Sequence, residues 1–213
     1  MSLLLLGDLG GTNVRFSLHR IDTAQQQSEN PALSEPVLQG RYHVKEFESL
    51  EAMVLRFLET VDEAGSKSEQ SFSRKSVVGL SMSVCGPVVK GSAVLLAAAF
   101  GKEGWKISEA SVQAATGLPK VMFLNDFHAV GLAMSTVPKT DIVCLWEGQG
   151  RSPSSPIAVL GPGTGLGQCY GVTVNGVTSV CCSEGGMSDF VPRTEQVLYL
   201  KALLWWCIRS GEL

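Results

Sequence analysis

The chain has 213 residues, of which 45% are hydrophobic and 17% charged, with a net charge of −3. This length supplies enough apolar material for one large domain or two small ones. Its 17 basic and 20 acidic residues give no basic surface that would indicate nucleic-acid binding. The apolar run at residues 3–6 is too short to span a membrane or to form a secretory signal, so we expect a cytoplasmic protein without membrane association.

Two strand-like runs, at about 3–8 and 14–20, flank the sequence Gly-Asp-Leu-Gly-Gly-Thr-Asn at residues 7–13. This pattern predicts a β-hairpin. Gly10 and Gly11 permit a positive φ and leave no side chain over the turn, so a phosphate can approach backbone N–H groups beside the Thr12 hydroxyl. The Asp8 carboxylate suits a phosphate that arrives with Mg²⁺. A purely structural turn is the alternative.

Alternating patterns continue along the chain. Residues 22–36 are rich in Gln, Ser, Asn and Pro and predict a loop, and residues 66–76 predict a polar, serine-rich surface loop. Strands are expected at 37–43 and 77–84, and helices at 48–63 and 108–116. This order of strands and helices indicates an open, layered α/β architecture.

A buried-strand run at 120–125 ends in Asn125 and Asp126. Ligands bind at the carboxyl ends of strands in open α/β sheets. Asp126 is therefore a candidate general base for a sugar hydroxyl that attacks phosphorus, and Asn125 offers a donor and an acceptor to a sugar diol. The alternative is that Asp126 is the N-cap of the helix that follows.

A second glycine-rich sequence, Gly-Pro-Gly-Thr-Gly-Leu-Gly at residues 161–167, also lies between strand-like runs. It fits neither the dinucleotide-binding fingerprint nor a Walker A loop. Together with the first hairpin it predicts two sides of one polyphosphate site. The polar segment 148–156 before it is expected to be a loop between two further strands.

The last third of the chain contains a strand-like run at 177–182, then Glu184, then an expected helix at about 193–209 with a broad apolar face. Glu184 alone is equally consistent with an ordinary turn residue. The six cysteines lie mostly in apolar runs and form no C-x-x-C pair, which favours buried free thiols.

Five motifs occur in the order and approximate spacing of bacterial-type glucokinases: the two hairpins, Cys-Gly-Pro at 85–87, Leu-Asn-Asp-Phe at 124–127 and Glu-Gly-Gly at 184–186. The chain resembles this family, part of the hexokinase–actin–Hsp70 ATPase superfamily, along essentially its whole length. The resemblance implies ribonuclease H-like (actin-like ATPase) α/β lobes, a small lobe at 1–124 and an incomplete large lobe at 125–213. It also implies phosphorylation of glucose to glucose 6-phosphate, a step into glycolysis, with ATP and Mg²⁺.

The resemblance also implies roles for individual residues. Asp126 would be the catalytic base and a sugar contact, Asn125 and Glu184 would bind the sugar, and Asp8 would organise Mg²⁺. The ATP phosphates would face Gly10, Gly11, Thr12 and Asn13 on one side and Gly163, Thr164 and Gly165 on the other.

Three departures from the family pattern are evident. Met187 occupies the position of a sugar-binding histidine, and the apolar residues 96–100 replace a polar pair that precedes the tryptophan matching Trp105. Each lost hydrogen bond in a buried polar site costs on the order of 1–3 kcal/mol. The chain also ends where family members continue, so we expect a C-terminally truncated product whose last helix is exposed to a partner chain, including a homo-oligomer.

Two hypotheses follow. The first is an ATP-dependent hexose kinase acting on glucose or a related hexose. The second is a non-catalytic sugar- or nucleotide-binding interaction protein on a degraded or truncated glucokinase scaffold. Neither implies a nucleic-acid or membrane partner.

Overall fold

The structure is a computed structural model that describes residues 2–21, 35–68, 72–96, 100–101, 103–134, 136–148, 150, 152, 155–163, 165–188 and 191–210, apart from the side chains of 139 and 204–210. Several sequence predictions lie outside the described residues. They concern most of the 22–36 loop, the apolar residues 97–99, Thr164, and the part of the last helix's apolar face that follows residue 203.

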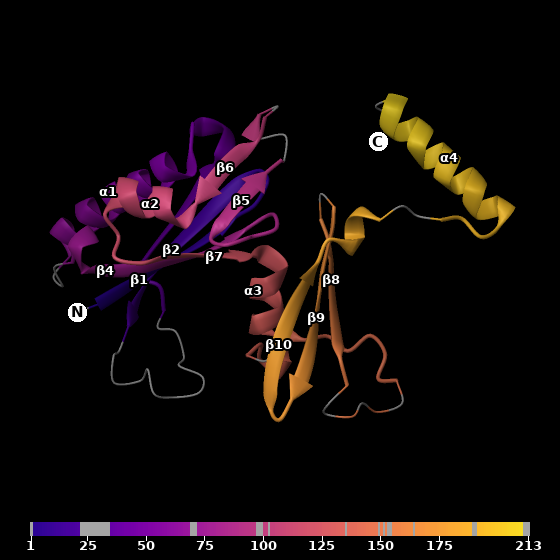
Figure 1. Cartoon of the computed structure of the whole chain (residues 1–213). Helices are drawn as coiled ribbons and strands as arrows, with labels where there is room; N and C mark the ends of the chain where they lie inside the picture. Colours follow the sequence, from indigo (N-terminus) through magenta and orange to yellow (C-terminus); the bar gives the residue numbers. More distant parts are fainter. Residues whose placement is uncertain are drawn as a thin grey trace.

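A five-stranded mixed sheet forms the first half of the molecule (Figure 1). Its strand order is β3-β2-β1-β4-β7. β2 is antiparallel to β1 and β3, whereas β1, β4 and β7 run parallel. The strands are β1 (Ser2–Leu9), β2 (Asn13–Ile21), β3 (Leu38–His43), β4 (Val77–Val84) and β7 (Val121–Asn125). The strands predicted from alternation are therefore confirmed to within about two residues.

Two helices cover one face of this sheet, α1 (Leu50–Lys67) and α2 (Glu109–Thr116) (Figure 1). The Ser49 and Ser108 hydroxyls cap them by accepting backbone N–H groups of the first turns. α1 continues to Lys67, beyond the predicted end at residue 63. Its apolar stripe, including the buried Phe57, packs on the sheet residues of one hydrophobic core. A short hairpin, β5 (Ser92–Leu95) and β6 (Trp105–Ser108), adjoins α2.

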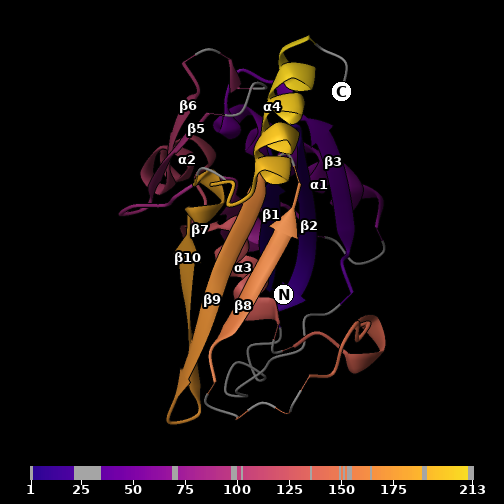
Figure 2. The same cartoon turned by 90° about the vertical axis from the view of Figure 1, so that its right-hand side faces the viewer.

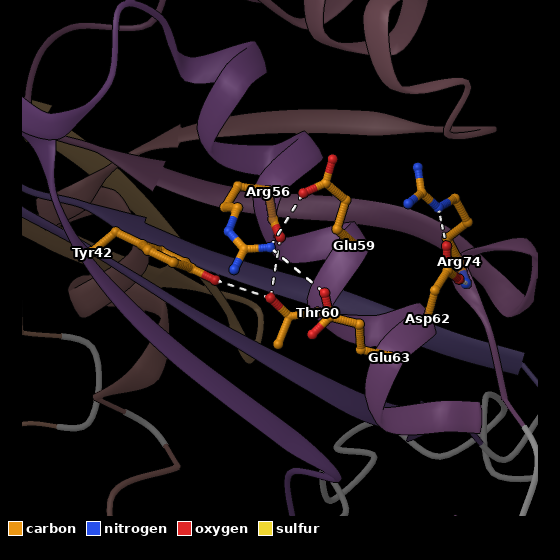
Figure 3. Close-up of polar contacts among 7 residues, drawn as sticks. All are labelled: Tyr42, Arg56, Glu59, Thr60, Asp62, Glu63 and Arg74. Carbon is orange, nitrogen blue, oxygen red and sulfur yellow. Dashed lines mark hydrogen bonds and ion pairs between the residues drawn. The ribbon is translucent and has the colours of Figure 1, made fainter. Parts of the chain in front are cut away.

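Polar contacts fix the outer side of α1 (Figure 3). Asp62 accepts hydrogen bonds from the backbone N–H and the side chain of Arg74, in the short 3₁₀ segment η3 (Arg74–Ser76) before β4. Arg56 pairs with Glu59 at 3.2 Å within the helix. The Tyr42 hydroxyl of β3 lies 3.4 Å from the Thr60 hydroxyl. The contacts of Asp62 and Thr60 tie the helix to η3 and β3, whereas the Arg56–Glu59 pair lies within the helix.

A second, three-stranded antiparallel sheet has the order β10-β9-β8. Its strands are β8 (Ile157–Pro162), β9 (Leu166–Val174) and β10 (Val177–Ser183). β9 and β10 join through Asn175 and Gly176, both with positive φ, as expected for an Asn-Gly turn. α3 (Asp126–Ala133) lies between the two sheets (Figure 1), and a Cβ on its Gly131 would come within 2.6 Å of Val180 and 2.8 Å of Cys169.

Two predictions in this half are wrong. The apolar residues before position 148 form no strand in the described part of the chain: the side chains of Leu145 and Trp146 are 94% and 89% exposed, and only a short 3₁₀ segment, η5 (Lys139–Asp141), precedes them. Of the described thiols only Cys169 is buried, while Cys144, Cys181 and Cys182 are exposed. Cys181 and Cys182 belong to β10 and are exposed although that strand pairs with β9.

The last helix, α4 (Glu195–Ser210), follows the single 3₁₀ turn η6 (Gly185–Met187). It stands apart from both sheets in Figure 1, and Figure 2 shows its axis from a second side. Leu198 and Leu203 on its predicted apolar face are 55% and 56% exposed.

Candidate functional site

The first glycine hairpin joins β1 to β2. The Gly10 N–H donates to the Asn13 carbonyl at 2.9 Å, and the Val44 N–H, just after β3, donates to the Thr12 carbonyl at 3.0 Å. The predicted β-hairpin is confirmed, but neither Gly10 nor Gly11 uses the positive φ that glycine permits. Gly10 and Gly11 line a cavity, and because glycine has no side chain they leave that cavity open.

Asn125, at the end of β7, is 8% exposed and has three hydrogen bonds. Its Oδ1 accepts the His128 N–H at 3.1 Å, which makes Asn125 the N-cap of α3. Its Nδ2 donates to the Gly86 carbonyl and to Asp126 Oδ1, each at 3.1 Å. The alternative in which Asp126 is the N-cap is therefore wrong: Asp126 is the first helical residue, held by the cap.

Asp126 has the environment of a proton acceptor. Burial raises its pKa, and the negative charge of Asp8 adds to the rise, against hydrogen bonds from the Phe127 N–H and Asn125. Both of those bonds end on Oδ1, the Phe127 N–H at 2.8 Å. A raised carboxyl pKa makes the group a stronger base once it has lost its proton.

The four glycines of the second hairpin divide into two pairs. A side chain on Gly161 or Gly167 would overlap the ring of Phe127, so these two are required by packing. Around Gly163 and Gly165 no atom of the described residues, apart from the chain neighbours, lies within 4 Å of a Cβ position, and the Gly163 N–H donates to the Gly165 carbonyl at 2.8 Å. Of these four glycines, Gly163 and Gly165 are therefore the two that leave open space for a ligand.

Glu184 lies between β10 and η6, whose last residue is Met187. The Met187 N–H donates to the Glu184 carbonyl at 2.9 Å, which closes the turn. The Met187 side chain is 84% exposed and offers no hydrogen-bond donor.

These segments enclose one cavity of about 470 Å³. It is lined by Gly10, Gly11 and Thr12 of the first hairpin, Asn125, Asp126 and Phe127 of β7 and α3, Gly161, Gly163, Gly165, Leu166, Gly167 and Gln168 of the second hairpin, Cys85 and Gly86 after β4, and Ser183, Glu184 and Met187. The structure thus brings together most of the residues singled out in the sequence, although they lie more than 170 positions apart.

Asp8 and Asn13 are not among the residues that line this cavity. Asp8 lines a neighbouring cavity of about 500 Å³ together with Arg15. Its Oδ1 accepts the Ser83 hydroxyl at 2.8 Å, and its Oδ2 lies 3.9 Å from the Arg15 guanidinium. Asn13 Oδ1 is buried and has no hydrogen-bond partner in the described part of the chain.

Several lining residues were given no role from the sequence, among them Phe127, Gln168 and Cys85. Phe127 follows Asp126 and Gln168 follows the second glycine-rich sequence, but nothing in their spacing indicated a contact. Cys85 lies within the Cys-Gly-Pro motif. Burial, together with the charges of Asp126 and Asp8, raises the pKa of its thiol to about 11. Whether a side chain lines a cavity depends on how distant segments pack together, and a local sequence pattern does not indicate this.

The strand order β3-β2-β1-β4-β7, with a second sheet joined through α3 and a cavity between glycine hairpins, defines an actin-like ATPase fold. The chain is similar to a glucokinase from an Antarctic psychrotroph, with a TM-score of 0.65 and 26% identity over 95% of this chain and 56% of that one. A glucokinase from Balamuthia mandrillaris, solved in complex with glucose, has the same fold, with a TM-score of 0.62 and 17% identity over 95% of this chain and 54% of that one.

The chain belongs to the glucokinase family, because the family model described as Glucokinase matches residues 5–207. The glucokinase of Nostoc punctiforme is 33% identical over 96% of this chain and 53% of its own length. A glucokinase of Yersinia pestis is 29% identical over 94% of this chain and 53% of its own length. The chain therefore spans about half the length of the curated relatives it matches.

Two further findings concern the described residues alone. None of their helices is both long and apolar enough to cross a membrane. They also contain no cluster of three or more His, Cys, Asp or Glu side chains arranged to hold a metal ion.

Proposed function

We propose that this chain takes part in ATP-dependent phosphorylation of a hexose, with glucose as substrate and glucose 6-phosphate as product. The observation that carries the proposal is the single cavity in which Asp126 lies among both glycine hairpins and Glu184. Phosphoryl transfer requires mainly positioning and charge neutralisation, and these residue types supply both. We further propose that the chain divides into a small lobe at 1–124 and part of a large lobe at 125–213.

Asp126 is the proposed general base. The sugar 6-hydroxyl oxygen attacks the γ-phosphorus of ATP while the bond from that phosphorus to the bridging oxygen breaks, and ADP leaves. The hydroxyl proton passes to Asp126 Oδ2, because Oδ1 already accepts hydrogen bonds from Asn125 and Phe127. The N-cap bond of Asn125 fixes the start of α3 and so holds this carboxylate in place.

The sugar side of the cavity is formed by Glu184, Asn125 and Met187. Both Nδ2 hydrogens of Asn125 are already used, so only its Oδ1 has acceptor capacity left for a sugar hydroxyl. Glu184 is therefore the principal hydroxyl acceptor in this proposal. Met187 adds apolar contact without a hydrogen bond.

We assign the phosphate side to the two hairpin tips, with Gly10, Gly11 and Thr12 in the first and Gly163 and Gly165 in the second. Asn13, the first residue of β2, follows the first tip, and Thr164 lies outside the described residues. The open space around Gly163 and Gly165 suits close approach of phosphate oxygens.

The residues present also fit Mg²⁺. Carboxylate oxygens are its preferred protein ligands, and Mg²⁺ is commonly held by one or two carboxylates, water and substrate phosphates, without a larger protein cluster. Asp8 lies near enough to Asp126 for its charge to raise the pKa of Asp126, so negative charge accumulates beside the cavity. Asp8 would hold the ion, which when bound neutralises charge on the ATP phosphates.

A second candidate function is sugar or nucleotide binding without catalysis. Met187 favours it, because this side chain lines the cavity on the sugar side and has no donor to offer a hydroxyl.

A coupled assay for glucose 6-phosphate, with glucose, ATP and Mg²⁺, tests the proposal. Asp126→Asn keeps the shape and the Oδ1 acceptor and removes the base, so turnover should fall about 10²- to 10⁴-fold. Asp141→Asn, on the exposed η5 segment, is the matched control and should leave turnover unchanged. Equal turnover in parent and Asp126→Asn would contradict the proposed base. Glucose binding by calorimetry without any turnover would favour the second function.

A further inference from the structure

We propose that Gln168 is a positioning residue for sugar binding, which holds the turn that places Glu184 and Met187 at the cavity. The inference rests on the function proposed above. Gln168 lies in β9, the central strand of the second sheet, opposite Ser183 of β10 and Leu160 of β8. It is partly buried and lines the cavity.

The Gln168 side chain supplies an acceptor to η6. With its amide oriented so that both ends are satisfied, Oε1 accepts the Gly185 N–H at 2.9 Å and the Gly186 N–H at 2.6 Å. The Ser183 hydroxyl also accepts the Gly185 N–H, at 3.1 Å, but Gly186 depends on Gln168 among the described contacts. One side chain thus fixes two successive backbone groups of the turn.

The η6 turn packs directly against β9. A side chain on Gly185 would overlap the Gln168 amide, and one on Gly186 would overlap the Leu166 carbonyl. The Gly-Gly pair after Glu184 is therefore required by close approach to β9, whatever ligand the cavity binds. Because Gly185 follows Glu184 directly, the position of this pair fixes the backbone from which the Glu184 side chain extends at the cavity.

Loss of the Gln168 acceptor would leave the Gly186 N–H without its partner and the Gly185 N–H with the Ser183 hydroxyl alone, which would allow the turn to move. A misplacement of about 1 Å in a binding group is enough to cost roughly 10²-fold in rate. Gln168 itself is not assigned a contact with the reacting atoms. Its effect on the sugar passes through Glu184.

Two variants separate the acceptor from the bulk of the side chain. Gln168→Leu keeps a similar volume and removes the acceptor, whereas Gln168→Glu keeps acceptor oxygens at the same reach. Gln39→Leu, on β3 in the other sheet, is a matched amide deletion. We expect calorimetry to show glucose affinity weakened about tenfold in Gln168→Leu, equivalent to about 1.4 kcal/mol, and within about threefold of the parent in Gln168→Glu and Gln39→Leu.

Amide hydrogen exchange without ligand supplies a second readout. The Gly185 and Gly186 amides should exchange faster in Gln168→Leu and at the parent rate in Gln168→Glu. Unchanged glucose affinity in Gln168→Leu, equal loss in both variants, or unchanged exchange would overturn the inference. A parent chain that binds no glucose would instead overturn the proposed function, and the exchange rates would still decide whether Gln168 holds the turn.

Discussion

The ring of Phe127 fills the space that a side chain on Gly167 would occupy. Phe127 follows Asp126 in α3, and Gly167 lies in the second glycine hairpin, so this contact places the proposed base next to one of the two hairpins that we propose to bind phosphate. It also gives Gly161 and Gly167 a packing role that is separate from phosphate binding.

Gly167→Ala should destabilise the protein. Its new methyl group would overlap the Phe127 ring, and overpacking of this kind typically costs about 1–3 kcal/mol. Urea unfolding measures the change. Gly163→Ala is the matched control, because no atom lies within 4 Å of its Cβ position. Adding Phe127→Leu to Gly167→Ala should recover part of the loss, and equal unfolding free energies for parent and Gly167→Ala would contradict the contact.

Asn125→Ala should lower the free energy of unfolding by about 1–3 kcal/mol. The change removes the N-cap of α3 and leaves the Gly86 carbonyl without its amide donor. Asn125→Asp keeps the capping oxygen and loses the donors, so it should cost less. Thermal or urea unfolding of the three proteins ranks them, and an Asp variant as unstable as the Ala variant would show that the cap contributes little.

The stability of the protein should depend on the protonation of Asp126. Burial, aided by the charge of Asp8, raises the native pKa of Asp126, so the native state holds this proton more tightly than the unfolded state does. The contribution of Asp126 to stability therefore declines as pH rises from the ordinary carboxyl pKa, about 3.9, through the raised native pKa.

Unfolding of the parent and Asp126→Asn in urea at a series of pH values measures this effect. The parent should lose stability relative to the variant as pH rises through that window, with the difference constant above it. A difference that is the same at every pH would mean that Asp126 has an ordinary pKa.

The thiols should differ in their rates of alkylation. With a pKa of about 11, only about one thousandth of Cys85 is thiolate at pH 8, whereas Cys144 is exposed. Iodoacetamide should therefore label Cys144 well before Cys85, and peptide mass spectrometry resolves the two. Cys144→Ser should abolish the fast phase at that position. Rapid labelling of Cys85 below pH 9 would contradict the raised pKa that follows from its partial burial and from the nearby carboxylates of Asp126 and Asp8.

Much of the fold could be predicted from local patterns. Alternation of apolar and polar residues predicted β4 at its observed bounds, Val77–Val84, because one face of that strand is buried. The Asn175-Gly176 turn carried an equally strong signal that was overlooked. The apolar run ending at Trp146 predicted a strand that does not form, since an apolar run pairs only where a neighbouring strand edge is available.

The sequence by itself determined where the candidate site lies: two glycine-rich hairpins, and an amide next to a carboxyl group, Asn125 and Asp126, after a buried strand. These signals are local patterns of a few residues, so they can be recognised without knowledge of how the chain packs. Only the tertiary structure decided that Asn125 rather than Asp126 caps α3, that Phe127 demands glycine at position 167, and that Gln168 holds the turn after Glu184. Each of these features depends on how α3 and β9 pack against neighbouring elements. That packing is determined by the burial of whole helix and sheet faces, which no local sequence pattern specifies.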